Sequence, residues 1–77
     1  MIVKVLGKGC KNCHKLGEIV AVAAKELNVN VTIEKVTDIN EIADYGVLRT
    51  PALVINETVV LQGKLPTVEN MKKFLTQ

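Results

Sequence analysis

Aromatic side chains are nearly absent from this sequence: its 77 residues include one Tyr, one Phe and no Trp. Proteins that bind single-stranded nucleic acid stack the bases on aromatic side chains. A net charge of +2 is also small for a protein that binds DNA through its phosphates. The sequence therefore argues against nucleic-acid binding, and its 48% hydrophobic content, mainly Val, Leu, Ile and Ala, predicts an aliphatic core.

Long apolar runs are absent as well. No segment approaches the roughly 20 apolar residues that a membrane-spanning helix needs, and the N-terminus lacks the apolar region and cleavage site of a signal peptide. The length suits one folding unit. We therefore expect a single cytoplasmic domain over residues 1–77 that is monomeric and has no membrane contact.

Cysteine is scarce: the sequence has two, Cys10 and Cys13, with two residues between them. In a reducing cytoplasm such a pair is more often catalytic or metal-binding than structural. A bridge that closes so short a loop would also add little stability. Acidic residues are missing from the first 17 positions, which contain four lysines. The cysteines therefore lie at the basic end of the chain.

The spacing of apolar residues predicts the elements of the first half. Residues 2–6 are apolar and largely β-branched and precede Gly7, which indicates a strand that ends in a loop. Apolar positions then recur every three and four residues, which predicts a helix over about 12–27 that is capped by Asn28. Alternation over 29–36 predicts a second, partly exposed strand.

The second half shows a different succession. Asp38 and Glu41 form a capping pattern, and they predict a short helix that ends at Gly46. Two apolar runs, 52–55 and 58–61, flank a polar pair and predict a hairpin.

Thr67 can cap a last helix with Val68, Met71, Phe74 and Leu75 on its inward face. The predicted order is βαβαββα. This order gives an α/β fold in which helices cover both faces of a four-stranded mixed sheet.

Three motifs, together with the distances between them in the sequence, make the chain resemble a known family. A Cys-x-x-Cys begins the first helix, Thr50-Pro51 precedes the hairpin, and Gly63 follows it. In this element order, the whole chain resembles the minimal thioredoxin fold of glutaredoxins and of small archaeal and bacterial redox-active disulfide proteins. The resemblance implies a thiol-disulfide oxidoreductase that acts as an electron carrier and uses no cofactor or metal.

The predicted place of the cysteines assigns each a role. A thiolate at a helix start is stabilised by unpaired backbone N–H groups and by the helix dipole. Cys10, at or before the first turn, is the predicted nucleophile, and Cys13, one turn further and less exposed, is the predicted resolving thiol. Lys8, Lys11 and His14 add minor positive charge nearby.

The resemblance also implies roles for residues distant in the sequence. The Thr50-Pro51 bond would be cis, with Pro51 facing the cysteine pair and Thr50 offering backbone hydrogen bonds to an extended substrate. Gly7 and Gly9 would turn the chain sharply and leave space above Cys10 for a partner's sulfur. Gly63 would border the same groove. An ordinary loop role stays open for all three glycines.

Departures from the family narrow the expected partners. Unlike larger thioredoxins, the sequence has no aromatic residue before Cys10, and no acidic residue in its first two strands is suited to accept a proton near Cys13. Lys11-Asn12 replaces the Pro-aromatic pair of glutaredoxins, and an evident acidic pair to hold glutathione is missing. We therefore expect protein disulfide substrates and a thioredoxin-reductase-like or other dithiol reductant in preference to glutathione.

The main alternative is a soft-metal module of the copper-chaperone type, in which two thiolates capture a monovalent ion. That family has the order βαββαβ, whereas residues 67–77 indicate a final helix and Thr50-Pro51 would have no role. Cys10 to His14 also fits the attachment signature of c-type haem. That assignment requires export, for which the sequence offers no signal. Disulfide exchange is the favoured interpretation.

Overall fold

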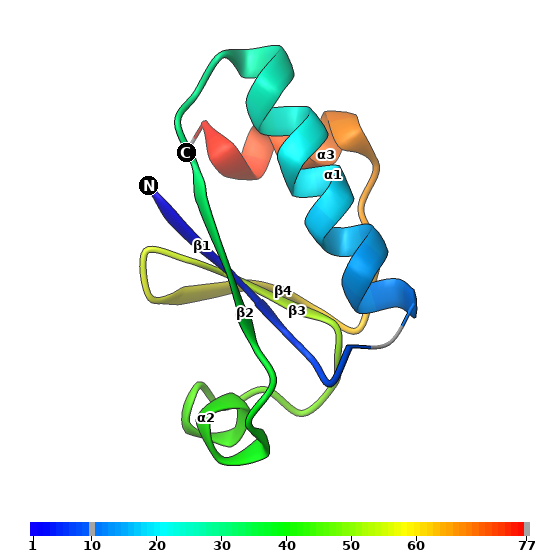
Figure 1. Ribbon diagram of the computed structural model, residues 1–77, viewed down its shortest axis with the longest axis vertical. Helices are drawn as coiled ribbons and strands as arrows, with labels where there is room; N and C mark the ends of the chain where they lie inside the picture. The colour runs from blue at the N-terminus through cyan, green and yellow to red at the C-terminus, as the bar shows by residue number, and fades with distance from the viewer. Residues whose placement is uncertain (10, 77) are drawn as a thin grey trace.

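A computed structural model describes residues 1–9 and 11–76 of the chain (Figure 1). The predicted order βαβαββα is confirmed. The elements are β1 (Ile2–Leu6), α1 (Lys11–Leu27), β2 (Thr32–Val36), α2 (Ile39–Asp44), β3 (Ala52–Ile55), β4 (Thr58–Gln62) and α3 (Val68–Leu75).

The four strands form one mixed sheet in the order β2-β1-β3-β4. β1 runs parallel to β2 and antiparallel to β3, and β3 and β4 form the predicted antiparallel hairpin. All four residues of β3 are buried, whereas most of β2 is exposed, because β2 lies at a sheet edge and β3 in the interior. The predicted mixed sheet is therefore confirmed.

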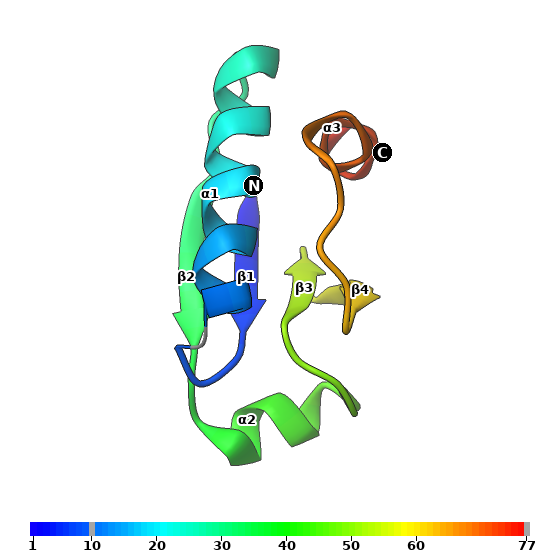
Figure 2. The ribbon, with the colours of Figure 1, turned by 90° about the vertical axis from the view of Figure 1, so that its right-hand side faces the viewer.

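Alternation along β1 supplies the two faces of the sheet. Val3 and Val5 pack with α1 and α3, whereas Leu6 belongs to a second apolar cluster with α2. Figure 2 shows α1 lying over β1 and β2, α3 at the height of the upper part of α1, and α2 beyond the opposite ends of the strands. The predicted arrangement of helices on both faces is confirmed.

The second strand is shorter than predicted, because it begins at Thr32 and not at residue 29. Asn28 adopts the left-handed conformation with φ of 57°, as expected of a helix cap. The Val29 N–H then donates to the Ala24 carbonyl over 3.0 Å. The alternating residues after Asn28 therefore begin as part of the helix end and reach the sheet only at Thr32.

The predicted caps and turn are confirmed. Asp38 accepts a hydrogen bond from the Asn40 N–H over 2.7 Å, and Thr67 accepts one from the Asn70 N–H over 3.1 Å. The hairpin turn places Asn56 and its neighbour at φ of 49° and 68°, which suits the twist of a two-residue hairpin loop. None of the helices in the described part of the chain is long and apolar enough to cross a membrane.

Met71 tests the packing of α3 against α1, because it has no exposed surface and belongs to the main core. We expect Met71→Ala to lower the free energy of unfolding by about 2–5 kcal/mol, since it removes buried surface and leaves a cavity. Urea denaturation measures this loss. Lys73→Ala, on the exposed side of the same helix, is the control and should change stability little. Equal free energies of unfolding for Met71→Ala and Lys73→Ala would contradict the packing of Met71 in the core.

Candidate active site

The loop after β1 leads into the first turns of α1, which hold the thiol of Cys13. Cys13 lies in the first turns of α1 and is only 6% exposed. The loop is tied to the edge strand because the Gly7 N–H donates to the Val36 carbonyl over 2.9 Å. Gly9 has φ of 76°, a left-handed conformation that favours glycine. Cys10, the predicted nucleophile, lies outside the described residues.

Gly7 makes the closest approach of the site. A Cβ atom built on Gly7 would overlap the Cys13 Sγ atom and would lie 3.7 Å from the Thr50 Cβ atom. A side chain at position 7 therefore conflicts with the buried thiol. The sequence predicted space above Cys10 at this glycine, and the structure shows that the space accommodates the sulfur of Cys13.

The loop before β3 provides the other wall. The Thr50-Pro51 peptide bond is cis, as the resemblance implied. Thr50 is exposed and Pro51 is buried. The Pro51 carbonyl accepts a hydrogen bond from the Gly63 N–H over 2.8 Å, which ties the end of the hairpin to this loop. Gly63 has φ of 73°, and a Cβ there would lie 3.1 Å from Arg49 side-chain atoms.

The structure thus joins several of the predicted site residues. Gly7, Cys13 and Thr50 converge directly, and Gly63 reaches the same region through its bond to Pro51. Roles in substrate binding for Gly9, Thr50, Pro51 and Gly63 stay predictions.

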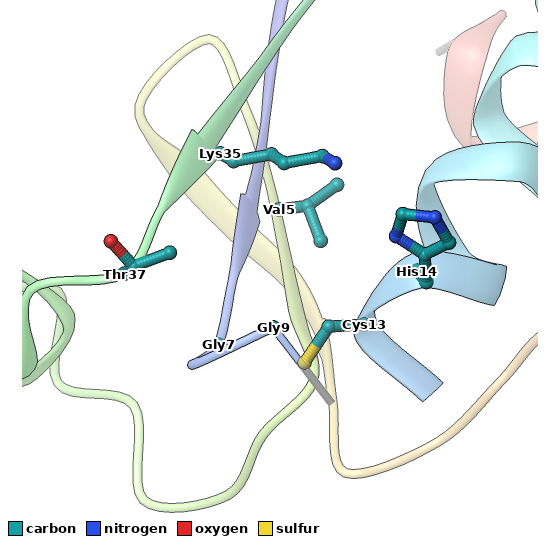
Figure 3. Close-up of a pocket in the computed structure, with 7 residues that line it drawn as sticks. All are labelled: Val5, Gly7, Gly9, Cys13, His14, Lys35 and Thr37. Carbon is teal, nitrogen blue, oxygen red and sulfur yellow. The ribbon is translucent and has the colours of Figure 1, made fainter. Parts of the chain in front are cut away.

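A small pocket of about 30 Å³ lies beside the thiol. It is large enough for about one water molecule. Figure 3 shows the Cys13 sulfur directed toward the Gly7 to Gly9 loop, with Lys35 of β2 reaching across above Val5 and His14 following Cys13 on α1. Carboxylates are absent from its lining in the described part of the chain.

Sequence reasoning missed Lys35 as a member of this pocket. Its position follows from the parallel register, which pairs Lys35 with Val5. The only available signal was the alternation in the second strand, and it did not specify which β1 residue each position would oppose.

Lys4 interrupts the apolar β1 strand, and the structure explains it. Its Nζ atom donates to the Tyr45 hydroxyl over 2.7 Å and to Glu57 Oε1 over 2.9 Å. The Tyr45 hydroxyl in turn donates to Glu57 Oε2 over 3.1 Å. Lys4 alternates with Val5 and lies on the α2 side of the sheet, so its charge is kept away from the Cys13 side.

These hydrogen bonds shift the titration of both charged groups. The bond to Tyr45, followed by the bond to Glu57, raises the pKa of Lys4 above its ordinary value. The bonds from Lys4 and then from Tyr45 lower the pKa of the Glu57 carboxyl. The cluster links β1, the end of α2 and the hairpin turn through one charged network.

Topology and site geometry together define a thioredoxin fold, in which a cysteine at the start of a helix faces the loop before the hairpin. A family model described as "Thioredoxin domain" matches residues 1–76, and the chain belongs to the thioredoxin family. At the level of this family, the protein is a thiol-disulfide oxidoreductase.

Individual relatives agree with this assignment. The chain is 39% identical over 75 residues to a thioredoxin of Methanocaldococcus jannaschii, covering 97% of this chain and 86% of the relative. It is 29% identical over 76 residues to a thioredoxin of Methanothermobacter thermautotrophicus, covering 99% of each. Thioredoxin 1 of Thermosipho africanus TCF52B shares the fold, with a TM-score of 0.57, 14% identity, and coverage of 99% of this chain and 96% of that one.

The overlap at Gly7 predicts that any side chain there disturbs the thiol. We expect Gly7→Ala to displace Cys13 and to lower the free energy of unfolding by about 1–3 kcal/mol, as overpacking does. Urea denaturation measures the loss. Gly17→Ala is the matched control, because a Cβ on Gly17 meets nothing within 4 Å. In the helix interior it should instead stabilise by about 1 kcal/mol. Equal effects of both substitutions would contradict the proposed steric conflict.

The Glu57 cluster predicts a pH effect. Because the pKa of the Glu57 carboxyl is lowered in the folded protein, the contribution of Glu57 to stability is present above its ordinary pKa of 4.5. This contribution is lost as the pH falls through the lower pKa of the folded state. A carbon-detected NMR titration should place the Glu57 midpoint below 4.5, and Tyr45→Phe should raise that midpoint because it removes one donor. A Glu57 midpoint that is the same in Tyr45→Phe and in the wild type would contradict the hydrogen bond from Tyr45 to Glu57.

Proposed function

We propose that this protein reduces disulfides in other proteins, with Cys10 as the nucleophile and Cys13 as the resolving thiol. The observation that carries the proposal is the buried Cys13 sulfur, which lies against Gly7 and close to Thr50 in a chain of the thioredoxin family. A resolving thiol needs this shielding, because it should attack only the mixed disulfide formed beside it.

The reaction proceeds in two exchanges. The Cys10 thiolate attacks one sulfur of the substrate disulfide, forms a mixed disulfide and releases the first substrate thiolate. The Cys13 thiolate then attacks the Cys10 sulfur, which closes the intramolecular disulfide and releases the second substrate thiolate. Two electrons pass to the substrate, and an external dithiol restores the reduced pair.

The start of α1 favours the thiolate form of the pair. α1 spans 17 residues, and its first turn has no acidic residue. The unpaired N–H groups at a helix start and the helix dipole both stabilise negative charge. Lys11 in the same turn adds a cation that solvent partly screens.

The cis-proline loop and its neighbours would hold the substrate. Thr50 is exposed beside Gly7, so its backbone is available to an extended segment that approaches the cysteines. Pro51 and Gly63 are joined by a hydrogen bond and would form one wall of the groove, with Gly9 on the opposite side. We propose these four residues as substrate contacts.

We further propose a reducing compartment, the cytoplasm, and a thioredoxin-reductase-like enzyme or another dithiol as the electron source. Two relatives named thioredoxin support protein disulfides as the substrate class. The soft-metal alternative is not favoured, because the observed order βαβαββα differs from the βαββαβ order of copper chaperones.

Single-cysteine variants test the two roles. We expect Cys10→Ser to reduce insulin turnover to the rate of dithiothreitol alone, because the attacking thiolate is lost. Cys13→Ser should accumulate a mixed disulfide with the substrate, because resolution is blocked. Turbidity and intact-mass measurements provide the two readouts.

The two variants also distinguish the rival chemistry. Turnover that is unchanged in Cys10→Ser would exclude the assigned nucleophile. If wild-type protein showed no exchange but its reduced form retained copper through a competing chelator, metal binding would replace disulfide exchange as the function.

A further inference from the structure

A cationic depression of about 480 Å³ lies along the first turns of α1, next to the cysteine loop. Its lining residues are exposed at the surface and come from one side of the helix together with the loop: Gly9, Lys11, His14, Lys15 and Glu18. Lys11 and Lys15 are one turn apart, and no carboxylate in the described residues forms an ion pair with either. Both ammonium groups are therefore available to a partner.

An apolar depression of about 320 Å³ lies on the other side of the same loop. It is lined by Lys8, Ile39, Ile42, Val47, Leu48 and Thr50. Leu48 is 92% exposed and Ile39 59% exposed, the highest values of any large hydrophobic side chain in the described residues. The Leu48 N–H donates to Gln62 Oε1 over 3.1 Å, which holds this loop against β4.

Each of the two depressions includes a residue of the loops that surround the thiol site. Gly9 borders the cationic one, Thr50 borders the apolar one, and Thr50 approaches the contact between Gly7 and Cys13. A segment that delivers a disulfide to this site would therefore extend over one depression on each side. Exposed apolar side chains next to a reactive site indicate a surface that a partner covers.

We infer that the two depressions form one docking surface for disulfide-bearing protein segments that carry carboxylates on one side of the cysteine and a large apolar residue on the other. This inference rests on the proposed function and adds the class of substrate. The carboxylates would contact Lys11 and Lys15, and the apolar side chain would cover Leu48 and Ile39.

The carboxylates on the α2 side of the molecule also favour binding of an acidic partner at the cysteine end. A separate depression of about 440 Å³ on the α2 side is lined by Lys4, Glu41, Asp44, Tyr45 and Glu57, so carboxylates predominate there. An acidic partner is repelled from that side and attracted to the cysteine end. Such charge separation raises association rates and suppresses wrong orientations.

Synthetic peptides test the cationic half directly. The probe is a short peptide whose single cysteine is joined by a disulfide to an uncharged fluorescent thiol, with two Glu residues on one flank and Leu on the other, made in both orders. A matched peptide has Gln in place of Glu. The readout is the ratio of second-order rate constants for the two peptides, because this ratio cancels changes in thiol reactivity.

We expect the Glu peptide to react about three to ten times faster at low ionic strength, with the ratio approaching one at high salt. Lys11→Gln combined with Lys15→Gln should bring the ratio close to one. Lys25→Gln combined with Lys73→Gln removes the same charge from exposed sites elsewhere and should preserve the ratio.

Leu48 tests the apolar half. Leu48→Ala should slow the Leu peptide by about threefold or more relative to a peptide with Ser at that position, at any salt concentration. Val22→Ala, at an exposed position in α1 outside both depressions, should leave this relative rate unchanged.

Equal rates for Glu and Gln peptides, or equal losses of the rate ratio in both lysine pairs, would overturn the inference while leaving disulfide exchange intact. Failure to react with any peptide would instead contradict the proposed function.

Discussion

The close approach of Gly7 to Cys13 is the constraint on which the site depends. Gly7 directly follows β1, its N–H donates to the Val36 carbonyl in β2, and it lies against both the Cys13 sulfur and Thr50. One residue without a side chain therefore connects two strands, the first turns of α1 and the loop before β3. The buried thiol can occupy its position only because nothing projects from the chain at that point.

Alternation in β1 separates two different electrostatic environments. Val5 borders the Cys13 pocket, whereas Lys4 projects to the other side and is neutralised by Glu57 with the help of Tyr45. A lysine in a central strand is accommodated because the hairpin turn and the end of α2 bring an acceptor and a carboxylate to it. The same alternation keeps these acidic groups away from the thiol.

Local signals allowed most of the fold to be predicted. The caps at Asp38 and Thr67 and the hairpin turn depend on residues close in sequence, and all are confirmed. The start of β2 was predicted wrongly, because the hydrogen bond from Val29 to Ala24 extends the helix end into an alternating segment. Alternation alone does not reveal whether a backbone N–H has already found a partner in the preceding helix.

The contacts of the site were harder to predict because they join distant segments. The cysteine spacing and the proline loop could be recognised in the sequence, and the cis bond followed from the resemblance. The conflict between a side chain at Gly7 and the Cys13 sulfur depends on how the loop returns under the sheet, and the place of Lys35 depends on the parallel register. Neither is encoded in a short motif.

Because the parallel register places Lys35 in the Cys13 pocket, the charge around this thiol also depends on the register. In the described residues, its pocket is lined by two basic side chains, Lys35 and His14, and by no carboxylate. Positive charge favours a thiolate, whereas burial favours the neutral thiol, so the Lys35 ammonium group opposes the effect of burial on Cys13. Among the described residues, the Cys13 pocket therefore receives positive charge from Lys35 on the edge strand β2 and no negative charge from a lining side chain.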